Sequence, residues 1–435
     1  MSAGMSMAGL SPDQGPPLAI PASFFVTAPM AVIAAGALLA AGGSSLLWTR
    51  FAGATVAFVH LGTLGLLACV MLGALYQLIP VVAGVSVPFV RVAHAVHAGL
   101  VLAVSALAWG FAMNQRVFVV VGADLLSLVF VVFLLPVAVA LARAPAHGAT
   151  LAGMRVAVLG LALVVGLGVW LGHLRGAGTA SPSYSSVVLV HLSAGLVVWI
   201  GGLIAGVSFQ VVPMFYLAPA FPRAVSWILV GSFALTLLGL IGALATGAGP
   251  TAIAGAALPG AIAAWVVHPI TALWVIVRRR RKRFDASLGF WKAGLASALL
   301  ALPCALLAVL GDDLRAPVLF GWIVLWGWAA MIVHGMLGRI VPFLVWFHRF
   351  SRRVGVEPVP SMKQLLPDLF PRVGFALHLS TLVLGVVALA TGVDLVARAT
   401  GVGLVATGAA MFVSIVRPLR HGRRRAYQSG NQTPS

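Results

Sequence analysis

The chain has 435 residues, of which 61% are hydrophobic and only 8% are charged. One soluble core cannot bury that much apolar surface, so the composition excludes a soluble globular protein of this size. Most of the apolar runs are longer than about 18 residues, the length at which a helix crosses a bilayer. Because lipid offers the backbone no hydrogen bonds, we expect these runs to be helices and the fold class to be an all-α polytopic membrane protein.

Hydropathy predicts twelve membrane-spanning helices. In chain order they cover residues 22–48, 52–82, 90–113, 117–142, 151–174, 184–214, 223–246, 251–277, 286–310, 316–347, 372–393 and 395–417. Residues 1–20 contain no signal peptide, and we expect a disordered tail there. Residues 418–435 form a basic tail. The longest polar connection contains SMKQLLPDLF, for which we expect a short interfacial helix capped by Ser361.

The formal net charge of +19 resides mainly in the connections between spans. Even-to-odd connections hold the clusters RRRRKR at 278–283 and HRFSRR at 348–353, whereas the opposite connections are poor in arginine and lysine. The positive-inside rule therefore places both tails in the cytoplasm, and we expect a multi-pass protein of a bacterial inner membrane. Cations in this pattern orient the chain in the lipid bilayer and do not indicate a nucleic-acid partner.

Cysteines and carboxylates narrow the chemistry further. The only cysteines, Cys69 and Cys304, lie in separate apolar runs, and no CxxCH or CxxC motif occurs. The sequence therefore excludes covalently attached c-type haem. Asp124 is the one acidic residue that we place within a span, and this scarcity argues against a proton pump or an ion-coupled carrier.

One phrase occurs three times at nearly equal intervals, as GALYQLIP from Gly73, GVSFQVVP from Gly206 and GMLGRIVP from Gly335. Each copy lies near the inner end of an even-numbered helix. The repetition predicts three four-helix units, 22–142, 151–277 and 286–417. Four spans return the chain to its starting side, so the units are parallel, and we expect a pseudo-threefold axis along the membrane normal.

Each copy of the phrase carries one polar residue, namely Gln77, Gln210 or Arg339. Glycine for close packing and proline for a helix end or kink explain most of the phrase without any function. The functional alternative is a set of polar groups facing the clefts between units. In that case the Arg339 guanidinium could hold a carboxylate such as a haem propionate.

Two histidines precede the phrase on equivalent helices. His60 opens HLGTLGLL shortly before Gly73, and His191 opens HLSAGLVV at a similar separation from Gly206. Both fall in the outer third of the membrane, where imidazole is costly unless it has a partner. They could face one cleft and bind opposite sides of a haem iron, or they could simply hydrogen-bond nearby groups. Phe320 and Trp322 occupy the corresponding positions of the third unit.

A second group of histidines lies nearer the cytoplasm, at a depth of roughly 10–15 Å. Its members are His97, His268, His334 and His378. We favour His334 as one inner ligand because it lies on a repeat helix close to Arg339. Its partner stays open between His97, His268 and His378, and structural roles for these residues are the alternative.

Twelve spans in three parallel units, with histidines on the second and sixth helices, resemble the haem–copper oxidase subunit I superfamily, including its NnrS-type relatives. The segments that show this resemblance are HLGTLGLLACVMLGALYQLIP at 60–80 and VHLSAGLVVWIGGLIAGVSFQVVP at 190–213. The resemblance implies that His60 ligates a low-spin haem near the outer face. It also implies that His191 occupies the place of a copper ligand.

The chain departs from that superfamily at several ligand positions. The seventh helix, 223–246, has no histidine where oxidases have a copper-binding pair. The outer half of the tenth helix, APVLFGWIVLWGW, lacks the histidines that ligate both haems there, and no tyrosine follows His191 as the oxidase pattern requires. The resemblance therefore implies a relative that is not a proton-pumping terminal oxidase.

We predict a protein that binds b-type haem through His60 and His191, with His334 as a further metal ligand, and that transfers electrons or handles nitric oxide or oxygen. Its partners would be a redox protein or a quinol, and it could be an oxidoreductase. Three alternatives stay open: copper binding by the same histidines, transport of a small substrate, and a subunit that supports assembly of a respiratory complex. Scattered methionines give the copper alternative no added support.

Overall fold

The computed structural model describes residues 15–430 apart from 146, 179–180, 182, 281 and 283–284, and only the backbone of 422–430. This part of the chain is helical and contains no strand. It has twelve helices that are long and apolar enough to cross a membrane, as predicted from hydropathy. Their ends lie within a few residues of the predicted ends, except that the tenth span continues to Arg353.

The helices follow one another in three groups of four spans. The first group comprises α1 (Ala19–Gly42) with η1 (Gly43–Leu47), α2 (Gly53–His60) with η2 (Leu61–Ala68) and α3 (Cys69–Ala83), η3 (Val90–Val92) with α4 (Ala93–Ala112), and α5 (Arg116–Arg143). The second comprises α6 (Ala149–Ala177), α7 (Tyr184–Ser193) with η4 (Ala194–Gly201) and α8 (Gly202–Tyr216), α9 (Arg223–Ala245), and α10 (Pro250–Ile262) with η5 (Ala263–Val267) and α11 (His268–Val277). The third comprises α12 (Ala286–Leu299) with α13 (Ala301–Leu310), α14 (Ala316–Trp322) with η6 (Ile323–Ala330), α15 (Met331–Phe350) and η7 (Ser351–Arg353), then α16 (Met362–Leu365), α17 (Leu369–Thr391) and α18 (Asp394–Gly430).

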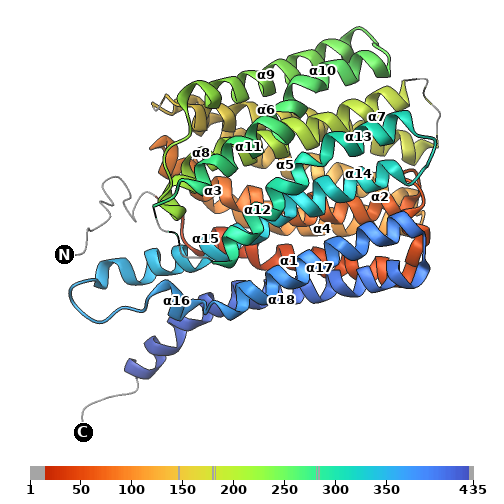
Figure 1. Ribbon diagram of the computed structural model, residues 1–435. Coiled ribbons are helices and arrows are strands. Elements are labelled where there is room, and N and C mark those ends of the chain that lie inside the picture. Colours follow the sequence, from red (N-terminus) through yellow and green to blue (C-terminus); the bar gives the residue numbers. More distant parts are fainter. Residues whose placement is uncertain are drawn as a thin grey trace.

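The two tails differ from the sequence-based expectation where they are described. Residues 1–14 and 431–435 lie outside the described residues, but α1 already begins at Ala19. The Pro16 carbonyl before it accepts a hydrogen bond from Nε2 of His348 at 3.2 Å. At the other end, α18 continues well past residue 417 and projects from the bundle (Figure 1). The short helix capped by Ser361 is confirmed as α16, where Ser361 and Gln364 form a reciprocal cap, and its interfacial position stays a prediction.

Spans two, six and ten form the centre of the bundle. Within the most apolar window of each, 78%, 72% and 67% of the residues are buried, against at most 56% for any other span. Each contains a π-helical segment, namely η2, η4 and η6, and these segments recur at the same intervals as the glycines that open the repeated phrase. The segment η6 contacts both η2 and η4, so the wide turns meet at the centre of the molecule.

The prolines of the phrase do not end their helices. The helix continues to Ala83 after Pro80, to Tyr216 after Pro213 and to Phe350 after Pro342. A proline inside a helix removes one backbone hydrogen bond and favours a bend. The interpretation of the phrase as a stop signal is therefore wrong, and a bend near the end of each central helix is the remaining structural role.

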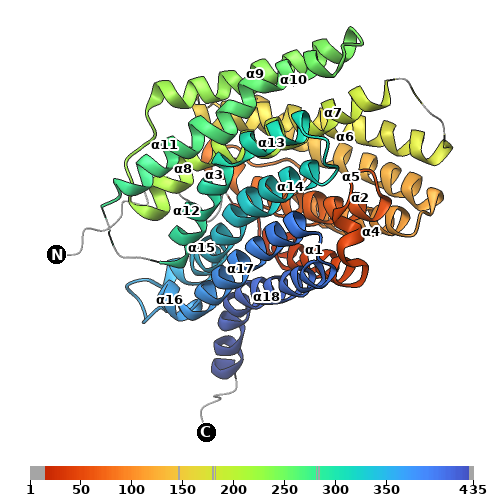
Figure 2. The same ribbon diagram turned by 45° about the vertical axis from the view of Figure 1, so that its right-hand side comes forward.

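Neighbour relations between spans are the same in all three groups. The first span packs on the second, the second on the third and the third on the fourth. The fourth span then contacts the first span of the next group: α5 packs on α6, α11 on α12, and α18 on α1. The last of these contacts closes the arrangement, and the two views of the bundle show α1 and α18 side by side (Figures 1 and 2).

The contact between the first and last helices is made through glycine. A Cβ atom on Gly36 would lie 2.6 Å from the carbonyl oxygen of Gly401, and a Cβ on Gly401 would lie 2.3 Å from the amide nitrogen of Ala40. Small residues permit this backbone-to-backbone approach, which is a principal source of helix association in lipid. At the end of α1, Arg398 donates hydrogen bonds to the carbonyls of Ala40 and Ala41.

Candidate functional site

His60 is held in one orientation at the junction between α2 and η2. Its Nδ1 lies 2.8 Å from the carbonyl oxygen of Val56, one turn earlier in the same helix. A carbonyl oxygen can only accept, and a neutral imidazole has one N–H and one lone pair, so Nδ1 carries the hydrogen. The lone pair is therefore on Nε2. The ring stacks against Phe111 of α4, with centroids 5.7 Å apart.

His191 has the same tautomer, fixed by a different helix. Its Nδ1 lies 2.9 Å from the carbonyl oxygen of Val164 in the neighbouring helix α6, so Nδ1 again donates and Nε2 again has the lone pair. The ring fits against Gly168, where a Cβ atom would lie 3.0 Å from Cε1 of His191. A metal-ligating histidine characteristically donates its other N–H to a backbone carbonyl or a carboxylate, as both of these imidazoles do.

His60 and His191 are near enough to interact electrostatically. The helices that carry them, α2 and α7, lie in the half of the bundle away from α18's projecting end (Figure 1). Both side chains are partly exposed, and no group among the described residues hydrogen-bonds either Nε2. A Cβ atom on Gly62 or Gly321 would meet no atom within 4 Å, so open space lies beside η2 and α14. Two free lone pairs therefore occur within one region of the membrane interior.

Aromatic residues replace imidazole in the third group of spans. Trp322 stacks on Phe58 of α2, with centroids 6.4 Å apart. Phe320 packs against Trp265 at 5.5 Å in an edge-to-face arrangement. Both aromatic residues occupy the positions that the repeat assigns to histidine in the other groups, so the third central helix contributes apolar walls and no ligand at this level.

Two of the inner histidines bond to neighbours within their own groups of spans. Nε2 of His97 lies 2.8 Å from Oγ1 of Thr27 on α1, and Thr27 itself donates to the carbonyl of Ser23. Nε2 of His268 lies 2.9 Å from Oγ of Ser208 on α8. The Nδ1 atom of His268 is buried and has no hydrogen-bond partner among the described residues.

His334 and His378 form a directed chain within the third group. Nε2 of His378 lies 3.1 Å from the carbonyl oxygen of Trp326 and must donate to it. Its Nδ1 therefore accepts from Nδ1 of His334 at 3.1 Å, which leaves the lone pair of His334 on Nε2. Gly374 makes room for that atom, and His334 borders a cavity of about 10 Å³, the size of one water molecule.

The inner histidines consequently do not converge on one site. A porphyrin cannot lie between two nitrogens at hydrogen-bond distance, so His378 is not the ligand opposite His334 in this structure. His97 and His268 have hydroxyl partners in the first and second groups of spans. Among the described residues, no three side chains of histidine, cysteine, aspartate or glutamate gather as a metal site. The geometry therefore supports the outer pair, His60 and His191, as candidate metal ligands more than any pair of inner histidines.

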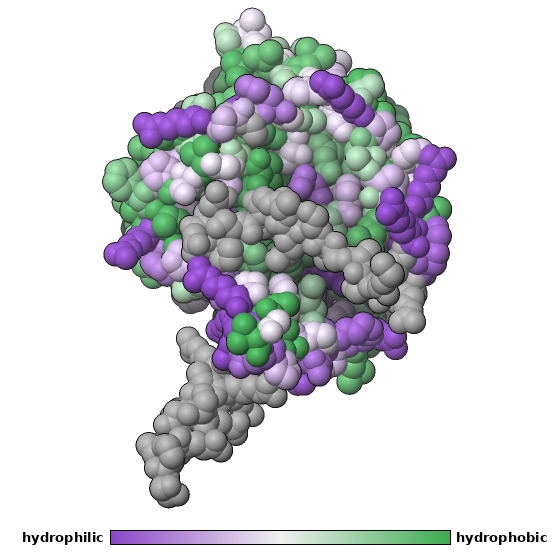
Figure 3. Space-filling view, turned by 90° about the vertical axis from the view of Figure 1, so that its left-hand side faces the viewer, coloured by the Kyte–Doolittle hydropathy of each residue, from purple (hydrophilic) through white to green (hydrophobic). Residues whose placement is uncertain are grey.

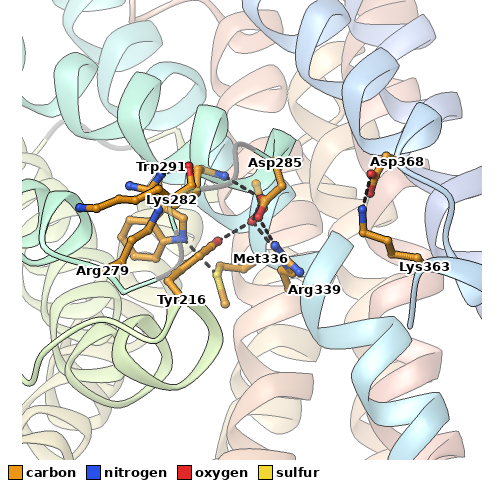
Figure 4. A network of polar contacts seen from close by, with 11 residues as sticks. Tyr216, Arg279, Lys282, Asp285, Trp291, Met336, Arg339, Lys363 and Asp368 are labelled. Atoms are coloured by element: carbon orange, nitrogen blue, oxygen red, sulfur yellow. Dashed lines mark hydrogen bonds and ion pairs between the residues drawn. The ribbon is translucent and has the colours of Figure 1, made fainter. Parts of the chain in front are cut away.

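Arg339 belongs to a polar network at the end of the bundle where α18 projects (Figure 4). Its guanidinium forms an ion pair with Asp285 and donates to Oγ of Ser287 at 3.1 Å. Oγ of Ser287 also lies 2.6 Å from the hydroxyl of Tyr216, so α8, α12 and α15 meet here. The carboxylate that Arg339 holds is therefore Asp285 of the same chain, and its role toward a haem propionate stays a prediction.

The other two polar residues of the phrase have different surroundings. Gln77 is buried, and its Oε1 atom has no hydrogen-bond partner in the described part of the chain, whereas Gln210 is exposed. These residues and Arg339 therefore do not share one environment. The functional alternative for the phrase, a common set of polar groups, has no support in their contacts.

Replacing Asp285 by asparagine is expected to lower the free energy of unfolding by about 1.5–3 kcal/mol, because the Arg339 guanidinium loses a charged hydrogen-bond acceptor in a partly buried site. Denaturation in detergent micelles, followed by tryptophan fluorescence, measures this loss. The control is Asp313→Asn, which removes an exposed ion pair with Arg315 at the opposite end of the bundle. Equal losses in the two variants would show that the network contributes no more to the free energy of unfolding than an exposed ion pair does.

Several contributors to the site were not predicted from the sequence. They are the carbonyls of Val56 and Val164, the packing position Gly168 and the π-helical segments beside both histidines. The repeated phrase is the one sequence signal that could have located the π-helical segments, because both recur at the same intervals. Backbone acceptors carry no side-chain signature, so the sequence offers no means of finding them.

Comparisons with known proteins provide no evidence for the function of this chain. No protein-family model and no curated protein matches this chain. The expected relation to the haem–copper oxidase superfamily therefore continues as a hypothesis that depends on architecture and on the histidine pattern.

Proposed function

We propose that this chain is an integral membrane protein that binds b-type haem through His60 and His191. The observation that carries the proposal is the matched state of the two imidazoles. Each donates Nδ1–H to a backbone carbonyl and leaves its Nε2 lone pair free, and the two lie within electrostatic range of each other. His60 and His191 would hold the iron of b-type haem through these nitrogens.

We further propose that the three groups of spans are parallel repeats around a pseudo-threefold axis. Matching π-helical segments and matching neighbour relations support this interpretation, as does the closing contact between α18 and α1. The same features support a diverged relative of the haem–copper oxidase superfamily. The start of α1 and the projecting end of α18 lie at the arginine-rich end of the bundle, which fits a bacterial inner membrane with cytoplasmic termini.

Residues of the chain would fix the ligand geometry before any cofactor binds. Val56 holds His60 within its own helix, and Val164 holds His191 from a neighbouring helix. Bound haem would supply one-electron redox chemistry, and the surrounding apolar side chains would exclude water and tune its potential. A quinol or a redox protein is the expected electron donor. His97, His268 and the bonded pair of His334 and His378 lie in three different groups of spans, so the proposal includes no inner ligand pair. The proposed role is electron transfer or nitric oxide handling, not that of a proton-pumping oxidase.

Copper binding by the same two histidines is the second candidate. The cavities beside α18 and beside His334 both lie away from the outer pair, and a metal ion needs far less space than a macrocycle. Two imidazole nitrogens from separate helices also suit copper. The two candidates share their ligands and differ in absorption, which makes them separable.

The test is an absorption spectrum and metal analysis of protein purified from cells supplied with haem and copper. Haem binding predicts a Soret band that His60→Ala and His191→Ala each remove or strongly weaken. His94→Ala, which removes an exposed imidazole from α4, is the control and should leave the band unchanged. Colourless protein with stoichiometric copper would favour the second candidate. Protein without haem, iron or copper would refute both.

A further inference from the structure

A cavity of about 310 Å³ lies along one face of α18, near the end of the last span. Phe412, Val413 and Val416 line its deeper part, and Arg417, Arg420 and His421 line the part nearest the membrane boundary. These positions recur at the spacing of successive helical turns, so they share one face of the helix. The order from apolar to basic follows the order of tail and headgroup in a lipid.

The basic end of this cavity lacks a carboxylate partner. No acidic residue lines it, and the described residues provide no ion pair to Arg417 or Arg420. The Arg417 guanidinium instead lies 4.7 Å from the centroid of the Phe370 ring, which positions the charge without neutralising it. The Nδ1 atom of His421 is buried and has no hydrogen-bond partner among the same residues. Three nitrogen-bearing side chains thus border one side of a space where an anion would be stabilised.

The geometry points to an anionic phospholipid as the occupant of this cavity, with its phosphate against Arg417 and Arg420 and one acyl chain along Phe412, Val413 and Val416. Arginine binds phosphate oxygens through paired N–H groups, and basic pockets at the ends of membrane helices suit such headgroups. The volume lies at the lower end of the range for small-ligand sites, enough for a headgroup and the start of a chain.

The position of the cavity fits this occupant. It lies near the end of the bundle from which α18 projects (Figure 1), and hydrophilic residues occur around the edge of that end of the molecule (Figure 3). Arg349 of α15 donates to the carbonyl of Leu419 at 2.8 Å and anchors α18 beside the cavity. A lipid bound here would therefore contact the segment of α18 that leaves the membrane. This inference is independent of the haem proposal, because it involves none of the residues near His60 or His191.

Native mass spectrometry of the full-length protein, titrated with phosphatidylglycerol or phosphatidylcholine, tests the inference. Phosphatidylglycerol should bind more tightly, and Arg417→Gln and Arg420→Gln should each weaken it about fivefold. The control is Arg278→Gln, which removes a cation placed 3.7 Å from the Trp274 ring centroid at the same end of the bundle. It should leave the affinity unchanged, and thermal unfolding should show that all three variants fold.

Three results would overturn the inference. The first is equal affinity for the two lipids, which would reduce the cavity to an apolar groove. The second is an equal loss in Arg278→Gln, which would indicate general attraction to the basic end. The third is complete displacement of phosphatidylglycerol by inorganic phosphate, which would assign the site to a free anion.

Discussion

Replacing Gly401 by valine is expected to lower the free energy of unfolding by about 3 kcal/mol or more. The added side chain would overlap the backbone of α1, because even a Cβ atom at this position lies 2.3 Å from the amide nitrogen of Ala40. Neither backbone can yield without separating the two helices. The first and last spans would then lose the close packing that holds them together in lipid.

Denaturation with increasing fractions of sodium dodecyl sulfate, in mixed micelles, measures this effect. Gly242→Val is the matched control, because a Cβ at Gly242 meets no atom within 4 Å and the residue is exposed on α9. That variant should differ from the original protein by less than about 0.5 kcal/mol. Similar stability in both variants would mean that α1 and α18 do not touch as the structure describes.

If the chain binds haem as proposed, replacing Gly168 by valine is expected to weaken that binding about 10- to 100-fold, the effect usual for losing the support of a metal ligand. The valine side chain would enter the space of the His191 ring, since a Cβ at this position is already 3.0 Å from Cε1. A displaced ring loses the hydrogen bond from Nδ1 to the Val164 carbonyl, and the Nε2 lone pair then no longer has a fixed orientation. Titration of the purified protein with haem, followed by its absorption, gives the affinity.

Gly166→Val provides the control for this experiment. Gly166 lies close to Gly168 on the same helix, and a Cβ there meets nothing within 4 Å, so this variant should bind haem as tightly as the original protein. Equal affinities in the two variants would remove His191 from the ligand set while leaving haem binding itself intact. Failure of the unaltered protein to bind haem would instead contradict the proposed function.

The membrane fold could be predicted from the sequence because hydropathy depends on local composition. Twelve apolar runs predict twelve spans, and the described residues have them at nearly the same positions. The role of the prolines in the phrase was harder to predict, because a proline is compatible with either a helix end or a kink, and the helices continue past all three. The last helix also extends through the arginine-rich tail, where charge decides the membrane boundary and has little influence on helix formation.

The candidate site could be predicted only in part. Shared helix position and depth suggested that His60 and His191 lie in one region, and the two imidazoles are near enough to interact electrostatically. Their joint role as ligands stays a prediction. The rotation of each helix, the tautomers and the π-helical turns depend on contacts between distant segments, such as the one from His191 to Val164. The same limitation explains the inner histidines, whose similar depth suggested a second site although each has its own neighbour.

The glycine contact between α1 and α18 also bears on how the protein is made. The face of α1 that carries Gly36 has its partner near Gly401, and the residues that join the two helices at Ser44 and Asp394 are 350 positions apart. Because α18 is the last span to be synthesised, α1 can make this contact only after all the other spans have been made. Until then the face of α1 that packs on α18 lacks its partner helix. We therefore expect the packing of the last span on the first to be the final step in assembling the bundle.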